Sequence, residues 1–280
     1  MQLREILTAA TALLDSKEHL RDTARRDAEF LLLHQLGLSR AQLLTDPDRE
    51  LTAEDEFFYW QSIYRRAAGE PIQYILGQQE FYGRIFHVTP AVLIPRPETE
   101  HLVEAVLACL PCDSPLQLLD VGTGSGILAV TLALHLPCAE IAAIDISPEA
   151  LAVARGNAER HHVADRIYFL QSDLLANVRG PFDAIVSNPP YIPDADRTTL
   201  HSQVRDHEPS TALFAGPDGL DIYRRLIPQA HAALTPGGLL ALEIGHGQRD
   251  DIEGLLAGWG EINFIDDLQQ ISRVALARRP

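Results

Sequence analysis

The stretch Leu118-Leu-Asp-Val-Gly-Thr-Gly-Ser-Gly-Ile127 decides the fold of this chain. Its apolar residues up to Val121 predict a buried strand, and the apolar run after the third glycine predicts a helix. Gly122, Gly124 and Gly126 lie between them and allow the backbone to approach a ligand closely. A strand, a glycine-rich turn and a helix in this order are typical of the first unit of a doubly wound α/β domain.

Short apolar runs recur on both sides of this turn, and most are separated by helical segments. This alternation predicts a mainly parallel, doubly wound, Rossmann-like sheet. The expected strands are Leu116–Val121, Glu140–Ile146, Arg166–Leu170, Ala184–Ser187 and Leu239–Ile244. Ligands of such folds bind beyond the carboxyl ends of the strands. We therefore expect the chemistry at residues 120–126, Asp145, Asp173 and Asn188.

Residues 1–71 predict a small helical bundle. Apolar residues recur at helical spacing from Leu3 to Leu14, and a helix-compatible run from Arg21 ends at Gly37. Thr52 begins a motif similar to a capping box, which predicts the start of another helix. The arginine pairs in this region, Arg25–Arg26 and Arg65–Arg66, are interpreted as solvated helix faces.

Residues 72–92 change to β-branched and aromatic residues punctuated by glycine. We expect the segments 72–76 and 84–88 to pair as a β-hairpin that links the bundle to a larger domain over residues 93–280.

Composition restricts the class of protein. The 280 residues are 46% apolar, enough for a substantial core, yet no run approaches the roughly 20 apolar residues of a membrane span. The formal charge of −16 disfavours stable binding to nucleic acid. Three cysteines are too few for a disulfide framework, and the start of the chain lacks a secretory pattern, so we expect a cytoplasmic protein. The eleven histidines and the Cys109/Cys112 pair predict no metal site.

The glycine loop narrows the choice of cofactor. Ile127 stands where a nicotinamide-binding loop has its third glycine, and no lysine completes a Walker loop. The spacing instead suits a cofactor without pyrophosphate, such as S-adenosylmethionine, which is released as S-adenosylhomocysteine. The residues expected to bind it in this loop are Gly122, Thr123, Gly124, Ser125 and Gly126.

Two carboxylates are expected to complete the cofactor site. Asp145 follows a predicted strand about 20 residues after the glycines, where it can accept hydrogen bonds from ribose hydroxyls. The alternative role for Asp145 is to cap the next helix, but Ser147 fits that role better. Asp173 and its apolar neighbour Leu174 follow the next strand, where contacts to adenine are expected.

The tetrapeptide Asn188-Pro189-Pro190-Tyr191 is the predicted catalytic element. Its prolines fix the backbone, so the side-chain carbonyl of Asn188 and the main-chain carbonyl of Pro189 become two fixed hydrogen-bond acceptors. Such a pair suits a planar NH2 group whose nitrogen is to be methylated, and Tyr191 is expected to stack on that group or to wall the pocket. In isolation the motif is also compatible with a plain turn after an edge strand.

These and other stretches resemble the HemK/PrmC family, the protein-(glutamine-N5) methyltransferases that modify peptide chain release factors. The matching stretches are Tyr74–Gly83, Ile94–Glu100, Asp120–Gly126, Asp145–Ser147, Asn188–Tyr191, His207–Leu213, Gly216–Leu220 and Glu243–Gln248. The resemblance implies a seven-stranded methyltransferase sheet with an antiparallel last strand and an N-terminal domain that docks the release factor. It also implies that the acceptor is the glutamine of the Gly-Gly-Gln motif used in translation termination, and that Asn188 contacts both cofactor and substrate. Gln269–Arg273 departs from the family, which more often has a glycine-containing turn there, and this leaves the entry of the last strand open.

Two other functions remain compatible with parts of the pattern. DNA adenine-N6 methyltransferases use similar Asn/Asp-Pro-Pro-Tyr loops on a planar amino group, although the charge of −16 opposes DNA binding. A non-catalytic, cofactor-sensing partner of the translation machinery would have no need for two fixed acceptors.

Overall fold

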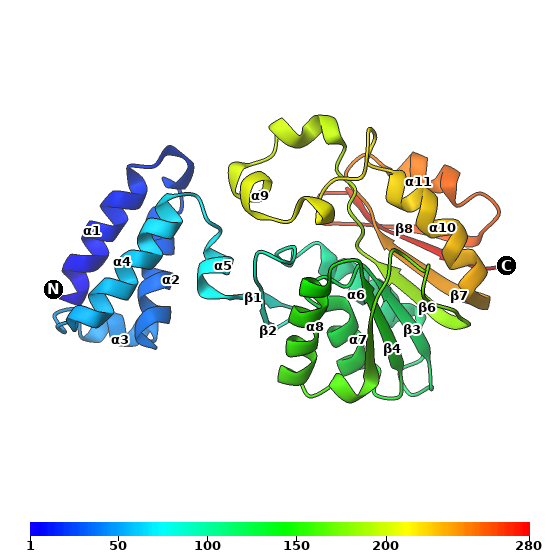
Figure 1. Ribbon diagram of the computed structural model, residues 1–280, viewed down its shortest axis with the longest axis horizontal. Helices are drawn as coiled ribbons and strands as arrows, with labels where there is room; N and C mark the ends of the chain where they lie inside the picture. The colour runs from blue at the N-terminus through cyan, green and yellow to red at the C-terminus, as the bar shows by residue number, and fades with distance from the viewer. The chain divides into compact units, whose positions relative to one another are not determined.

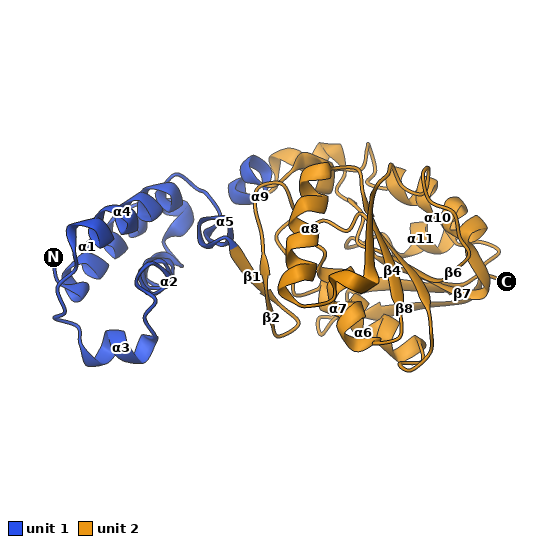
Figure 2. Cartoon of the chain, turned by 60° about the horizontal axis from the view of Figure 1, so that its bottom comes forward, with its two compact units in different colours: residues 1–77, 201–207 blue, residues 78–200, 208–280 orange.

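The computed structural model describes residues 1–280, which form two compact units (Figures 1 and 2). Met1–Gly77 and His201–His207 make up the first unit, and Gln78–Leu200 and Glu208–Pro280 the second. None of the helices combines the length and the apolar character that a membrane span requires.

The first unit is helical, as the sequence predicts. Its elements are α1 (Leu3–Asp15), η1 (Glu18–Leu20), α2 (Ala24–Leu36), α3 (Arg40–Thr45), α4 (Ala53–Ala67), α5 (Ile72–Leu76) and, from a distant part of the chain, α9 (Ser202–His207). Gly37 ends α2 in the left-handed conformation at φ +61°. The Thr52 hydroxyl caps α4 by accepting a hydrogen bond from the Asp55 N–H at 3.1 Å.

One arginine of this unit differs from the prediction. Arg65 is solvated and pairs with Glu70, but Arg66 is buried, with its Nε atom 2.8 Å from Oδ2 of Asp27 in α2. The reason is helical spacing, because position 66 lies on the same face of α4 as the buried Tyr59 and Ile63. The interpretation of Arg66 as part of a solvated face is therefore wrong.

A β-hairpin is present, but one of its strands differs from the prediction. Residues 72–76 form the short helix α5, and the hairpin pairs β1 (Gln78–Phe81) with β2 (Arg84–His87). Gly77 ends α5 in the left-handed conformation, so the isoleucines of this segment belong to a helical turn. Tyr82 and Gly83 connect the strands with φ values of +51° and +70°, as a tight hairpin turn requires.

The second unit contains the predicted doubly wound sheet. Its remaining elements are α6 (Thr99–Cys109), β3 (Gln117–Val121), α7 (Ile127–His135), β4 (Glu140–Asp145), α8 (Pro148–Arg160), η2 (Ala164–Arg166), β5 (Ile167–Gln171), β6 (Phe182–Ser187), η3 (Asp194–Thr198), η4 (Ser210–Ala212), α10 (Asp221–Ala233), β7 (Leu234–Glu243), α11 (Arg249–Leu255), β8 (Gly260–Asp266) and β9 (Ser272–Arg278). The seven strands lie in the order β5-β4-β3-β6-β7-β9-β8, and β9 alone runs in the direction opposite to the other six. The strand order reverses between β3 and β6, which is where ligands bind in this class of fold.

Helices cover both faces of the sheet (Figure 1). Alternate strand residues point to opposite faces, so Leu118 packs in the cluster under α6 and α7, whereas Leu119 packs in the cluster with α10. The central strands are buried from both sides and read as continuous apolar runs.

The entry of the last strand is intact despite its departure from the family pattern. Gln270 adopts φ +62°, the left-handed conformation that glycine takes more easily. The carboxylate of Asp267 holds this turn, because its Oδ1 accepts from the N–H groups of Gln269 and Ile271 at 2.8 and 3.1 Å. Its Oδ2 accepts from Nε of Arg273, also at 2.8 Å.

Candidate active site

A cavity of about 360 Å³ opens at the carboxyl ends of the central strands, inside the second unit. Its volume is within the range of ordinary small-molecule sites. Most residues predicted for the site line it, namely Gly122, Thr123, Gly124, Ser125, Asp145, Asp173, Leu174, Asn188, Pro189 and Pro190. Gly126 and Tyr191 do not. The tertiary structure thus brings together four stretches that are up to about 70 residues apart in sequence.

The N–H groups of the glycine loop are largely used within the protein. Those of Gly122 and Thr123 both donate to the carbonyl oxygen of Ile144 at 2.9 Å, and that of Gly124 donates to Oδ2 of Asp145 at 2.9 Å. A loop that binds pyrophosphate instead presents its N–H groups to the ligand. This geometry therefore fits a cofactor without phosphate groups.

The same loop leaves room for a ligand. Gly122 and Gly124 have φ values of +72° and +55°, and a Cβ added to Gly122 would meet no atom within 4 Å. A side chain at Gly122 would be strained, and it would project into open space beside the strand ends. The cavity, its open glycine backbone and its carboxylate suit S-adenosylmethionine.

The carboxylate that begins the loop ties it to α7. Oδ2 of Asp120 accepts from the Thr123 hydroxyl at 2.6 Å and from the Ala129 N–H at 3.1 Å. Burial raises the pKa of Asp120 to about 7, and these two hydrogen bonds oppose the rise. Its other oxygen has no partner.

Asp145 is positioned to accept hydrogen bonds from the hydroxyl groups of a ligand. Its Oδ1 accepts from the N–H of Ser147 at 2.9 Å, which together with the bond from Gly124 fixes the carboxylate. Each carboxylate oxygen keeps a second lone pair, so Asp145 can still accept hydrogen bonds from two ribose hydroxyls. The Ser147 hydroxyl caps α8 by accepting from the Ala150 N–H at 3.1 Å, as the sequence predicts.

Asp173 and Leu174 form another side of the cavity. The Asp173 carboxylate lies 2.7 Å from Nη2 of Arg225, another lining residue, and both side chains are about half exposed. Leu174 has φ +48°, and its carbonyl oxygen accepts from the Ser172 hydroxyl at 2.6 Å. The backbone of this turn is therefore held by its own side chains.

The side chain of Asn188 has a defined orientation. Its Nδ2 atom donates to Oγ1 of Thr99 at 3.1 Å. Because Nδ2 is held on that side, Oδ1 is left as an acceptor on the other. Pro189 and Pro190 line the cavity immediately beyond it.

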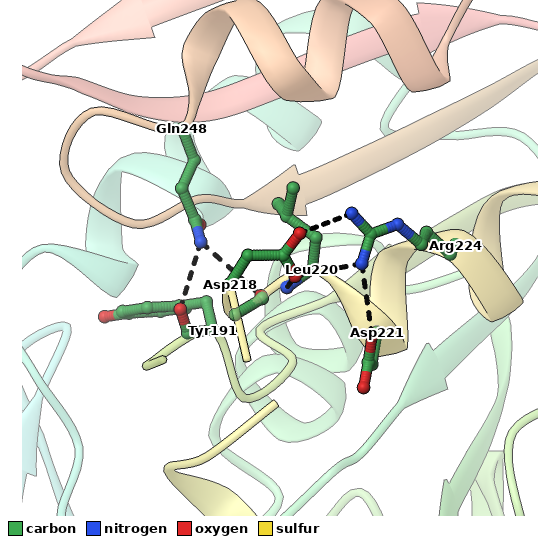
Figure 3. A network of polar contacts seen from close by, with 7 residues as sticks. Tyr191, Asp218, Leu220, Asp221, Arg224 and Gln248 are labelled. Carbon is green, nitrogen blue, oxygen red and sulfur yellow. Dashed lines mark hydrogen bonds and ion pairs between the residues drawn. The ribbon is translucent and has the colours of Figure 1, made fainter. Parts of the chain in front are cut away.

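Tyr191 lies outside the cavity lining and is anchored by its own backbone. Its carbonyl oxygen accepts from Nε2 of Gln248 at 3.0 Å (Figure 3). Gly219 approaches so closely that an added Cβ would lie 2.2 Å from the same carbonyl oxygen. The neighbouring loop is held by Asp218, which pairs with Arg224 at 2.5 Å (Figure 3). The stretches 216–220 and 243–248 thus fix the backbone of Tyr191 at the end of the Asn188–Tyr191 tetrapeptide.

Comparison with known proteins gives the family. The chain is 45% identical over 282 residues to a release factor glutamine methyltransferase of Koribacter versatilis, covering 100% of this chain and 99% of that protein. The corresponding protein of Moorella thermoacetica is 51% identical over 238 residues, which is 84% of this chain and 83% of the relative. The chain belongs to the release factor glutamine methyltransferase family.

Family models and solved structures agree with this membership. The PrmC N-terminal domain model matches residues 5–77, and the methyltransferase small domain model matches residues 100–205. A ribosomal protein L11 methylase from Lactobacillus delbrueckii has 25% identity and a TM-score of 0.51, covering 72% of this chain and 89% of its own. The Thermus thermophilus 16S rRNA methyltransferase RsmC, solved with AdoMet and guanosine, has 21% identity and a TM-score of 0.54 over 72% of this chain and 50% of its own, which shows a shared fold.

Sequence reasoning missed several residues of the candidate site. Arg96 lines the cavity and donates to Oε1 of the buried Glu208 at 2.5 Å, while Oε2 of Glu208 accepts from the Ile94 N–H at 3.1 Å. Thr99 lies next to Asn188. These residues stand inside stretches that match the family, but only the tertiary structure shows what they contact.

Proposed function

We propose that this protein transfers a methyl group from S-adenosylmethionine to the side-chain amide N5 of the glutamine in the Gly-Gly-Gln motif of class I peptide chain release factors. One observation carries the proposal: the Asn188 amide is fixed through Nδ2, and its carbonyl oxygen remains free beside a cavity suited to the cofactor. The names of the relatives support the choice of acceptor.

The cofactor site is assigned to the cavity residues described above. Gly122–Gly126 would lie along the methionine part, Asp145 would accept from the ribose, and Asp173 with Leu174 would border the adenine. When bound, S-adenosylmethionine supplies an electrophilic methyl group and leaves as S-adenosylhomocysteine.

The acceptor nitrogen is activated by hydrogen bonding. The lone pair of an amide nitrogen is delocalised into its carbonyl group, so the free amide is a poor nucleophile. Oδ1 of Asn188 and the carbonyl oxygen of Pro189 accept the two N–H protons and draw the nitrogen toward tetrahedral geometry. Positive charge develops on nitrogen as the new bond forms, which strengthens both hydrogen bonds in the transition state. The alkylated nitrogen is strongly acidic and loses its proton without a dedicated base.

Different parts of the chain are given different roles. We assign docking of the release factor to residues 1–71, the link to residues 72–92 and methyl transfer to residues 93–280. Release factors act on ribosomes in the cytoplasm, where we place the reaction. The negative charge of the chain, −16, favours a protein acceptor with a basic surface over nucleic acid, and we propose no stable nucleic-acid complex.

The decisive experiment is transfer of a labelled methyl group to purified release factor. Labelling should disappear when the glutamine of the Gly-Gly-Gln motif is replaced by glutamate, because two carbonyl acceptors would then face a carboxylate without N–H groups. Asparagine should react poorly, since it is one methylene shorter. Equal labelling of the glutamate variant, or stronger labelling of duplex DNA, would reject the proposed acceptor.

A further inference from the structure

A buried carboxylate lies beside the catalytic tetrapeptide. Glu243 ends β7, and strand register pairs its neighbour Leu242 with Ser187, the residue before Asn188. Glu243 is only 3% exposed. Its Oε1 atom lies 3.5 Å from the Tyr191 hydroxyl, and its Oε2 atom has no hydrogen-bond partner. A buried carboxylate with so few partners destabilises the fold and invites a functional explanation.

Thr99 contacts Asn188, and its helix α6 packs against β7, the strand that Glu243 ends. It is the first residue of α6 and is fully buried. Its Oγ1 atom accepts from Nδ2 of Asn188 at 3.1 Å, so its own hydroxyl proton must be donated elsewhere. Glu243 is the buried acceptor with a free oxygen, at the end of the strand against which α6 packs. Hydrogen bonding from Thr99 also lowers the pKa of Glu243, in the direction of the ionised form.

We propose that Glu243, through the hydroxyl of Thr99, sets the orientation of the Asn188 amide so that its carbonyl oxygen faces the substrate. Both residues are positioning residues and act through Asn188. The inference rests on the proposed function, because only an NH2-bearing acceptor makes the orientation of this amide matter.

The argument depends on the direction of each hydrogen bond. A carboxylate is an acceptor only, so the Thr99 hydroxyl donates toward Glu243 and offers its lone pairs to Nδ2 of Asn188. A neutral group at position 243 can itself donate to the hydroxyl. The Thr99 hydroxyl is then free to donate to Oδ1 of Asn188. This favours the flipped amide, in which Oδ1 and Nδ2 have exchanged places. The Asn188 NH2 group would now face the NH2 group of the substrate, and two donors repel.

The ionisation of Glu243 should therefore govern turnover. Burial raises its pKa to about 7, and Glu98 adds to the rise, whereas Thr99, Arg273 and Tyr191 oppose it. Tyr223 also faces the residue, since its hydroxyl donates to the Glu243 main-chain carbonyl at 2.7 Å. Protonated Glu243 can donate like a neutral amide, so kcat of the unmodified enzyme should fall below neutral pH toward the value of a Glu243→Gln variant.

The first test is substitution of Thr99, measured as kcat and KM with release factor as the acceptor. Thr99→Val keeps the shape and removes the hydroxyl, and it should lower kcat by about tenfold or more while cofactor affinity changes little. Thr99→Ser restores a hydroxyl and should recover most of kcat. Thr131→Val is the matched control, because Thr131 in α7 is equally buried and its hydroxyl has no partner. It should keep full activity.

The second test is a double-mutant cycle between Thr99→Val and Glu243→Gln. Coupled residues lose their effect together, so the double variant should be no slower than the slower single variant. The Glu243→Gln variant should also lose the dependence of kcat on pH near neutrality. Unchanged kcat in Thr99→Val, or multiplied losses in the double variant with an unchanged pH profile in Glu243→Gln, would overturn the inference. An unmodified enzyme that labels no release factor would instead reject the proposed function.

Discussion

Replacing Glu243 with glutamine should stabilise the fold at alkaline pH even as it slows the reaction. The carboxyl group is fully buried, and desolvation raises its pKa from 4.5 to about 7. The folded protein thus holds this proton more tightly than the unfolded chain does. The contribution of the carboxyl to stability is greatest below pH 4.5, where both states are protonated, and it is lost as pH rises through about 7.

The size of the effect follows from the shift. One pKa unit corresponds to about 1.4 kcal/mol, so the full shift is worth about 3.5 kcal/mol, of which about 2.5 kcal/mol falls between roughly pH 5 and pH 8. Glutamine has no such titration. The free energy of unfolding of Glu243→Gln, minus that of the unmodified protein, should therefore increase by about this amount between the two pH values. Other titrating groups, such as Asp120, cancel in the difference.

Urea unfolding of both proteins at the two pH values measures this difference. Glu253→Gln on the exposed side of α11 serves as the control. Its free energy of unfolding, minus that of the unmodified protein, should be the same at both pH values. If the difference in free energy of unfolding between Glu243→Gln and the unmodified protein is also independent of pH, the Glu243 carboxylate is not desolvated in the folded protein. A gain in stability with a loss in turnover is the expected signature of a residue kept for function.

Four further substitutions test the site and the fold. Asp145→Ala should weaken S-adenosylmethionine binding roughly 10- to 100-fold in calorimetry, because charged hydrogen bonds to the ribose are lost, and unchanged affinity would remove Asp145 from the site. Asn188→Ala should lower the methylation rate about 100-fold with a much smaller effect on cofactor affinity, and near-normal turnover would contradict the two-acceptor mechanism. Arg66→Met removes the buried guanidinium that pairs with the Asp27 carboxylate, leaving it the Thr23 hydroxyl and the exposed Arg26, and should lower the free energy of unfolding of the first unit by about 3–5 kcal/mol; adding Asp27→Asn should recover part of the loss. Gln270→Gly should raise the free energy of unfolding by about 0.5–1 kcal/mol, because glycine adopts the left-handed conformation of this turn without strain. Thermal unfolding measures this change, and a lower melting temperature would contradict the prediction.

The sequence by itself determined the elements whose signals are local. The strand, glycine turn and helix around Gly122–Gly126, the capping of α4 by Thr52 and the end of α2 at Gly37 all follow from backbone preferences of neighbouring residues. The gathering of Asp145 and Asn188 at one edge of the sheet could also be predicted. In a parallel sheet the carboxyl ends of successive strands meet at that edge.

Only the tertiary structure decided features that depend on contacts between distant segments. The segment 72–76 has strand-like composition, yet Gly77 ends it as a helical turn and moves the hairpin onward. Burial of Arg66 required Asp27 from another helix, which no local pattern reveals. Thr99 and Glu243 are 144 positions apart, and the register of β6 and β7 and the start of α6 place both of them near Asn188. Sequence patterns record which face of an element is buried, but the partner of each polar group is fixed only when the elements pack.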